Sequence, residues 1–255
     1  MTAPFALRHT VNRLLKAFTV APISVLLCFF QALGHERIDA EHGAEYLKRI
    51  RELNAVIEQE NSTEQRGEAL VALGETVARI VESLNRDLQS HYGELGLAST
   101  VIVHELKAEG IELTLWPEAM RYKRYVKPYE QYVTLLPEGP RRDEALFRIL
   151  QGRFYDSFIY DPLQQVNLGW FDLVVQIQEE EAFLARYPDF PNREEVLFIL
   201  IVDCVRAVHQ ALDANSKPIY TARARVLLQE FFTTYPNSLR VSAAQMLLQN
   251  LPAVE

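Results

Sequence analysis

The strongest restriction on how this chain folds comes from a proline-containing turn that occurs three times between amphipathic segments. The three turns are Leu136–Pro140, Tyr187–Pro191 and Tyr235–Ser238. Five positions before the first proline of each turn stands an aromatic residue: Tyr132, Phe183 and Phe231. Eight positions after that proline stand apolar residues of small or moderate size: Ala145, Val196 and Ala244. These matching positions predict three helix–turn–helix pairs of one kind.

Proline explains why each turn separates two helices. It cannot continue a helix, and it biases the residue before it away from the helical region. The aromatic side chain near the end of the first helix is then expected to pack against the returning helix. Pro137, Pro188 and Pro236 stand 51 and 48 residues apart. Because one helix pair cannot bury its apolar face alone, this spacing predicts a stack of helix pairs, that is, an α-solenoid.

Helical periodicity also dominates the preceding region. Apolar residues recur at steps of three and four within 44–59 and again within 64–89, which predicts two helices and a hairpin between them. Ser62 followed by Gln65 resembles a capping box at the start of the second helix. A short helix is expected to end near Gly110, and the alternating residues 111–115 are expected to form an extended connector rather than a sheet.

The predicted fold is therefore all-α, with an N-terminal helical hairpin followed by an α-solenoid of three degenerate helix pairs. The expected organisation is a signal peptide at 1–34, a helical region at 35–116 and helical repeats at 117–255. An apolar content of 49% and a charged content of 24% are ordinary for a globular protein. The formal charge of −8 disfavours non-specific binding to nucleic acid, because an acidic surface repels phosphates.

The first 34 residues have the three parts of a secretory signal. Basic residues precede an uncharged apolar core at 20–30, and the small residues Ala32 and Gly34 precede a cleavage site before His35. After cleavage the chain would keep Cys204 alone and would have no membrane span. An uncleaved membrane anchor is the alternative, although the stretch 17–34 is shorter than a typical spanning helix and contains Pro22.

The last turn supports a family resemblance. Residues 230–238 read Glu-Phe-Phe-Thr-Thr-Tyr-Pro-Asn-Ser and are followed by Ala243 and Ala244. This segment resembles the tetratricopeptide-like repeats of bacterial envelope proteins, and the resemblance extends over about half of the chain. The repeat here is nearer fifty residues than the usual thirty-four. The resemblance implies a concave helical surface that binds other proteins or peptides.

Few residues match a catalytic or metal-binding pattern. His104 and Glu105 begin like a zinc-protease helix, but Ala108 stands where the second histidine ligand would be. Glu179 to Glu181 are adjacent on a predicted helix, so their side chains point in different directions. No catalytic residue, metal or cofactor is therefore predicted.

A basic and aromatic segment at 121–129 is the one candidate binding site. Its candidate residues are Arg121, Tyr122, Lys123, Arg124, Tyr125 and Lys127. Arginine and tyrosine are enriched at binding hot spots, and both can also stack on sugars. The competing interpretation is a helical stripe of tyrosines that packs the first repeat: Tyr122, Tyr125, Tyr129 and Tyr132.

These patterns together predict a non-enzymatic protein of the periplasm, an interaction or scaffold protein whose partner is another protein or peptide of the cell envelope. The sequence leaves its oligomeric state open. Two alternatives remain. One is a glycan-binding protein or hydrolase of the envelope that uses segment 121–129, and the other is a scaffold anchored in the inner membrane by an uncleaved signal.

Overall fold

The computed structural model describes residues 40–90, 95–116, 120–157, 169–211 and 215–252. The expected signal at 1–34 lies outside these ranges. Nine α-helices hold most of the described residues, and the strands there are two residues long. The all-α prediction is confirmed at this level. None of the described helices is both long enough and apolar enough to cross a lipid bilayer.

The chain divides into two compact units. One is Glu36–Leu200, and the other includes Ile201–Glu255. Helix α8 (Arg193–Gln210) contains the division point. The expected boundary between residues 116 and 117 lies inside the first unit, where helices from both sides of it pack together.

The N-terminal hairpin consists of α2 (Ala40–Gln59) and α3 (Thr63–Ser90), close to the predicted bounds. Half of the predicted capping box forms, because the Gln65 N–H donates to Ser62 Oγ at 3.3 Å. The Ser62 N–H instead donates to Glu60 Oε1 at 3.1 Å. Glu60 thus takes the role that the capping box assigns to residue 65.

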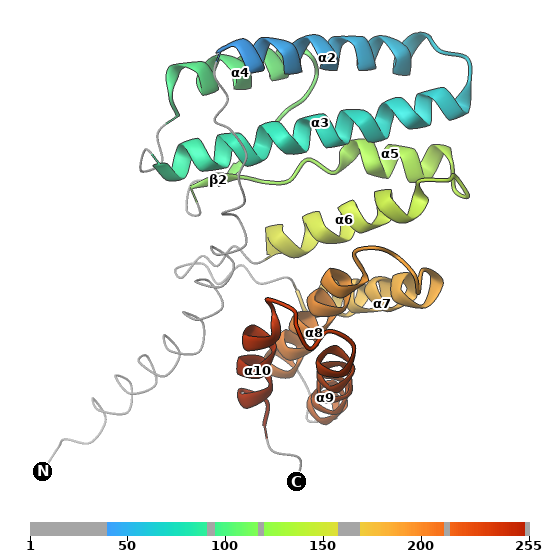
Figure 1. Cartoon of the computed structure of the whole chain (residues 1–255), viewed down its shortest axis with the longest axis vertical. Coiled ribbons are helices and arrows are strands. Elements are labelled where there is room, and N and C mark those ends of the chain that lie inside the picture. Colours follow the sequence, from blue (N-terminus) through green and yellow to red (C-terminus); the bar gives the residue numbers. More distant parts are fainter. Residues whose placement is uncertain (1–39, 91–94, 117–119, 158–168, 212–214, 253–255) are drawn as a thin grey trace, which may run out of the picture. The chain divides into compact units, whose positions relative to one another are not determined.

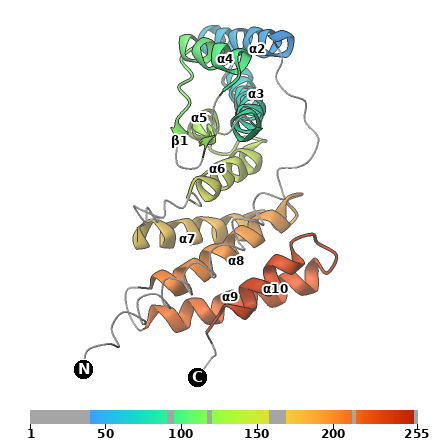
Figure 2. The same ribbon diagram turned by 90° about the vertical axis from the view of Figure 1, so that its left-hand side faces the viewer.

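Helix α3 is the centre of the first unit, since it is buried on two sides. Helix α2 packs on one side of it, and α5 (Lys127–Leu135) packs on the other (Figure 1). Helix α4 (Leu97–Ala108) lies beside α2 (Figures 1 and 2). Two core clusters result, one among α2, α3 and α4, and one that joins α3 to α5 and the following helix.

Glycine lets α5 approach α3 closely. A Cβ atom built on Gly74 would lie 2.5 Å from Tyr129 Cζ, and one built on Gly67 would lie 2.4 Å from Leu136 Cδ1. Both distances are far below van der Waals contact. The tyrosine ring of α5 therefore occupies space that any other residue at position 74 would need.

The connector after α4 contains a small sheet, which corrects the expectation of an extended segment alone. Strand β1 (Leu115–Trp116) pairs antiparallel with β2 (Arg121–Tyr122). Asn85 on α3 holds this pair in place, because its Nδ2 donates to the Tyr122 carbonyl at 3.1 Å and its Oδ1 accepts from the Tyr122 N–H at 2.5 Å. The partner strand was missed because it is two residues long and shows no alternation of apolar and polar residues.

The three proline corners share one backbone pattern. They join α5 to α6 (Arg142–Ser157), α7 (Trp170–Arg186) to α8, and α9 (Ser216–Thr234) to α10 (Val241–Gln249). At each corner the last N–H of the first helix donates to the carbonyl of the aromatic residue four positions earlier: Leu136 to Tyr132, Tyr187 to Phe183 and Tyr235 to Phe231. The residue three positions further on then donates to the carbonyl of that same end residue.

The aromatic and small residues predicted to pack around these corners are buried. Phe183 is 3% exposed, and Phe231 and Ala244 are both fully buried. Phe190, within the second corner, lies 5.1 Å from the Phe183 ring and 5.2 Å from the Phe147 ring, measured between ring centroids. The predicted burial of these corner residues is therefore confirmed, and the second corner also packs against Phe147 of the preceding helix α6.

Candidate functional site

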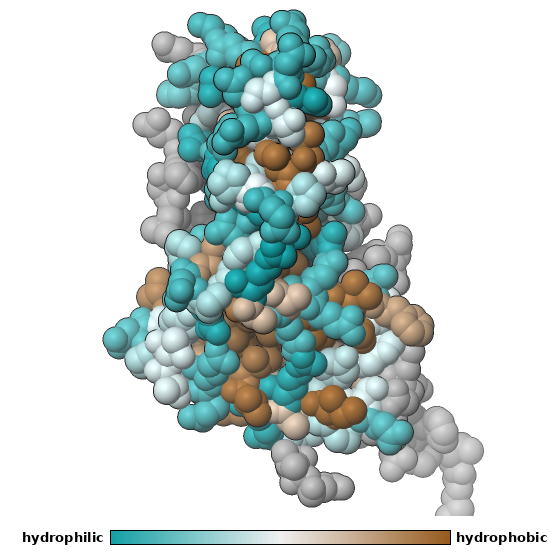
Figure 3. Space-filling view, turned by 90° about the vertical axis from the view of Figure 1, so that its right-hand side faces the viewer, coloured by the Kyte–Doolittle hydropathy of each residue, from teal (hydrophilic) through white to brown (hydrophobic). Residues whose placement is uncertain are grey.

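Apolar side chains gather in patches on an otherwise hydrophilic face of the molecule (Figure 3). The most apolar of the surface cavities described lies in the first unit, among α5, α6 and α7, and has a volume of about 380 Å³. We call it the α5–α7 groove. Its floor is apolar and consists of Val133, Leu146, Ile149, Leu150 and Phe183. Its charged and polar rim consists of Glu130, Arg142, Arg153, Glu179, Arg186 and Tyr187.

The floor follows from helical spacing. Leu146, Ile149 and Leu150 stand three and four positions apart on α6, so they share one face. Phe183 comes from the last turn of α7. The rings of Tyr187 and Phe190, which follow this helix, lie 5.0 and 5.1 Å from its ring, measured between centroids. The second proline corner thus fixes the aromatic end of the floor.

Ion pairs and one hydrogen bond cross the rim. Arg142 Nη1 donates to the Tyr187 hydroxyl at 3.3 Å, which links the start of α6 to the end of α7. Arg186 Nη2 pairs with Glu138 at 2.6 Å, although the Glu138 side chain is 78% exposed. Exposed pairs of this kind contribute little to stability, about 0 to 1 kcal/mol. Their arginines can therefore exchange partners at small cost.

One more rim pair joins Arg153 on α6 to Glu179 on α7, and both side chains are more than two-fifths exposed. The Arg142 Nε atom is buried and has no hydrogen-bond partner among the described residues. Because this atom is shielded from solvent, a partner from outside could be bonded only by the two Nη atoms of this guanidinium. The rim has three arginines and two glutamates, and the exposed Glu138 beside it pairs with Arg186. A carboxylate that displaced Glu138 would therefore meet a cation at this end of the groove.

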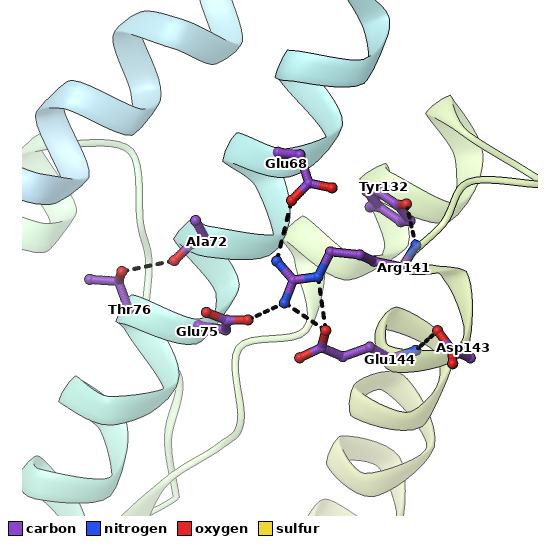
Figure 4. Close-up of polar contacts among 8 residues, drawn as sticks. All are labelled: Glu68, Ala72, Glu75, Thr76, Tyr132, Arg141, Asp143 and Glu144. Carbon is purple, nitrogen blue, oxygen red and sulfur yellow. Dashed lines mark hydrogen bonds and ion pairs between the residues drawn. The ribbon is translucent and has the colours of Figure 1, made fainter. Parts of the chain in front are cut away.

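A partly buried ion-pair network holds the start of α6 against α3 (Figure 4). Arg141 pairs with Glu75 and Glu144 at 2.5 and 2.6 Å and with Glu68 at 3.4 Å. Its backbone N–H donates to the Tyr132 hydroxyl at 2.9 Å. Burial opposes the charge of Arg141, but the hydrogen bonds to Glu144 and Glu75 outweigh it and raise its pKa. Helix α6 is thereby tied to α3 and α5 at its first turn.

The six candidate residues of segment 121–129 lie on the connector and at the start of α5. Two of them, Arg121 and Tyr122, are part of the interior. Arg121 donates to the Tyr155 carbonyl and lies 3.6 Å from the Asp156 carboxylate. Burial lowers its pKa, because a buried cation loses hydration. Tyr122 is 6% exposed and is held by Asn85. The Arg121 side chain thus connects the small sheet to the end of α6, and the Tyr122 backbone connects it to Asn85 on α3.

The remaining predicted residues differ in exposure. Lys123 Nζ lies 4.5 Å from the centre of the Trp116 ring. Arg124 stacks on Tyr155 at 4.3 Å, and its Nη1 donates to Gln151 Oε1 at 2.7 Å. Tyr125 is half-buried against the first core cluster, and Lys127 is exposed at the start of α5. Lys123 and Arg124 thus contact side chains of the protein itself rather than lining one shared cavity. The binding role of the segment remains a prediction.

The predicted tyrosine stripe is half wrong. Tyr129 and Tyr132 lie on α5 and are buried, but Tyr122 and Tyr125 precede the helix. Pro128 lies in the first turn of α5. Proline starts a helix more readily than it continues one, so the stripe cannot extend back through it.

A second cavity, of about 500 Å³, lies between α2 and α3 and is mainly polar. It carries cations and anions in similar number: Lys48, Arg49 and Arg79 against Glu45, Glu52 and Glu75. His42 also lines it. Over the described ranges, no group of three or more His, Cys, Asp or Glu side chains is placed to hold a metal ion.

The α5–α7 groove was not predicted, because its residues come from three consecutive helices whose packing the sequence pattern does not specify. Glu130 and Arg186 are separated by 56 positions but line the same cavity. The three proline corners were the available signal, since they bring the helices together. Comparison of the chain with protein families, with curated proteins and with solved structures finds no match.

Proposed function

We propose that this chain is a non-enzymatic interaction or scaffold protein of the bacterial cell envelope, and that it binds a segment of a partner protein in the α5–α7 groove. The single observation that carries the proposal is the composition of that groove. An apolar floor with one aromatic ring lies beneath a rim of arginine and tyrosine. Buried hot spots of protein interfaces have this composition.

The arrangement of the walls supports the same function. Arg141 holds α6 on α3, and Arg142 joins α6 to α7, so the groove is shaped before a partner arrives. A preformed site spends less conformational entropy on binding than a site that must be ordered. The α-solenoid arrangement of the three helix pairs belongs to this proposal, and it would extend such a surface along the chain.

Export belongs to the proposal as well. It depends on the signal-like segment 1–34, whose cleavage before His35 would release the protein into the periplasm. Mass measurement of the natural protein decides this point. A mature N-terminus at His35 is the expected result, and a retained N-terminus would instead place the protein on the inner membrane as an anchored scaffold.

A photo-crosslinking experiment tests the groove. Ala182 lines it and is exposed, so a photoreactive amino acid there will be next to any bound segment. Ala185 is exposed on the same helix but does not line the groove, and it is the matched control. We expect irradiation of living cells to crosslink one partner at position 182 and not at 185.

The substitution Ala182→Trp provides the complementary loss of function. The larger ring should fill the groove and remove partner binding without changing the core, whereas Ala185→Trp should bind normally. Equal crosslinking at both positions, or normal binding by Ala182→Trp, would refute a docking role for this groove.

A further inference from the structure

The face of α7 that lines the groove continues toward the start of the helix to two exposed apolar residues, Phe171 and Val175. Phe171, Val175, Glu179, Ala182 and Arg186 follow one another at steps of four, four, three and four positions. Residues at these steps share one face of a helix. The last three line the groove, and the first two are 78% and 52% exposed. The apolar surface therefore extends beyond the cavity toward the start of α7.

The length of this face restricts the occupant. Fifteen residue steps along a helix amount to about 23 Å, or roughly four turns. A single side chain fills the cavity, but only an elongated segment covers Phe171 and Val175 as well. Every lining residue of the groove belongs to a helix except Tyr187, which directly follows α7, so the lining offers no strand edge to pair with an extended peptide. A helix, in contrast, satisfies its own backbone hydrogen bonds.

The charges of the rim restrict the occupant further. Arg142 and Arg186 both lie at the end of the groove near Tyr187, since Arg142 bonds to this tyrosine and Arg186 stacks on it at 5.7 Å. Glu138, the ion-pair partner of Arg186, is exposed. A carboxylate brought by a partner could replace Glu138 and also satisfy Arg142. Charge-assisted bonds from arginine to carboxylate are the stronger class of hydrogen bond.

Building on the proposed function, we infer that the α5–α7 groove and the strip of Phe171 and Val175 bind an acidic amphipathic helix of a partner protein. The apolar side of that helix covers the strip and enters the cavity. Its carboxylates lie against Arg142 and Arg186. The partner is thus recognised by a pattern of apolar residues at helical spacing with Glu or Asp beside them.

Synthetic peptides test this inference. Two fluorescent helical peptides of about 16 residues share the same leucine-rich face and differ only in flanking Glu or Gln. Both are titrated into the whole protein while fluorescence anisotropy is recorded. We expect the Glu peptide to bind about tenfold more tightly than the Gln peptide, the effect of one good charge-assisted contact.

Variants assign the preference to the groove. The double substitution R142Q and R186Q should remove the advantage of the Glu peptide, and the control Arg240→Gln, outside the groove, should retain it. Phe171→Ser should weaken both peptides and cannot disturb the core, because this side chain is 78% exposed. Circular dichroism verifies that each variant keeps its helicity.

The outcomes separate the inference from the function on which it rests. Equal affinity for the Glu and Gln peptides, or no binding of either, overturns the inference that the groove binds an acidic helix. Retention of the Glu preference by the double arginine variant overturns it too. The crosslink at position 182 decides independently whether the groove binds a protein segment. A positive crosslink with equal peptide affinities would support the proposed function and refute the acidic helix as the ligand.

Discussion

Arg141 and Arg142 are consecutive in the chain but connect α6 to two different helices. Arg141 pairs with Glu68 and Glu75 on α3. Arg142 donates to the Tyr187 hydroxyl just beyond the end of α7. Two neighbouring cations at the start of α6 thus tie this helix to α3 on one side and to the end of α7 on the other. These contacts hold α6 in its place in the groove.

Replacing Arg141 should destabilise the protein. Arg141→Met leaves the carboxylates of Glu75 and Glu144 close together without their cation, and the loss of a partly buried network should cost about 2 kcal/mol of unfolding free energy. Urea unfolding followed by circular dichroism measures this. Glu68→Gln is the control and should change stability by less than about 0.5 kcal/mol, since Glu68 is 48% exposed and lies 3.4 Å away. Equal effects of the two substitutions would contradict the network.

The two buried tyrosines of α5 should respond differently to loss of their hydroxyls. The Tyr132 hydroxyl accepts from the Arg141 N–H at 2.9 Å, so Tyr132→Phe should cost about 1 kcal/mol. The Tyr129 hydroxyl is buried and has no hydrogen-bond partner within the described part of the chain. Tyr129→Phe should therefore be neutral or slightly stabilising at pH 7, as measured by chemical denaturation. A larger loss for Tyr129→Phe than for Tyr132→Phe would contradict this assignment.

Tyr129 should also make stability depend on alkaline pH. Burial raises its pKa from 10 to about 12. The folded protein then holds this proton where the unfolded chain has released it, so stability is complete below pH 10 and is lost as pH rises toward 12. The loss should reach about 1.4 kcal/mol at pH 11, one pKa unit above the unfolded value.

The variant Tyr129→Phe isolates this effect. Its unfolding free energy should fall less steeply than that of the original protein between pH 9 and pH 11, while Tyr132→Phe should follow the original slope. Parallel curves for the original protein and Tyr129→Phe would show that Tyr129 does not contribute to the loss.

Gly74 should not tolerate alanine, although alanine favours helices. Alanine stabilises a helix by about 1 kcal/mol relative to glycine. At position 74, however, its Cβ would lie 2.5 Å from the Tyr129 ring. Overpacking of this kind costs about 1 to 3 kcal/mol, so Gly74→Ala should be destabilising in thermal unfolding. Gly67→Ala should cost less, because the nearest atom there is the movable end of Leu136. Stabilisation by Gly74→Ala would show that α5 does not approach α3 as described.

Arg124 provides a test between the packing and binding interpretations of segment 121–127. It stacks on Tyr155 and bonds to Gln151, so we expect Arg124→Ala to lower the unfolding free energy by about 1 kcal/mol. The exposed Lys127 is the control, and Lys127→Ala should have no effect on stability. Loss of peptidoglycan binding by Arg124→Ala with unchanged stability would instead favour the glycan-binding alternative.

Local sequence signals account for most of the helices. The apolar stripes predicted bounds close to those of α2 and α3. The proline corners predicted the burial of Phe183, Phe231 and Ala244. Such features depend on residues within one or two turns of each other. Proline ends a helix wherever it occurs, and an apolar stripe needs a neighbour whichever neighbour that is.

The prediction that four tyrosines form one helical stripe was wrong, and the cause is a residue within the same segment. Tyr122 and Tyr125 have the spacing of a helix, but Pro128 follows them and starts α5 afresh. Pro128 is visible in the sequence, whereas the prediction rested on the spacing of the tyrosines alone. Proline in the first turn should have separated the four tyrosines into two groups.

The sequence by itself determined the helical class, the positions of the corners and the residues buried at them, because these depend on interactions close along the chain. Only the tertiary structure decided that Gly74 faces Tyr129, that Arg141 reaches Glu68 and Glu75, and that α5, α6 and α7 enclose a groove. These relationships join residues on different helices, and Gly74 and Arg141 lie more than fifty positions from the partners named here. Their geometry depends on how whole helices pack, and helix packing allows several angles and partners for the same stripe.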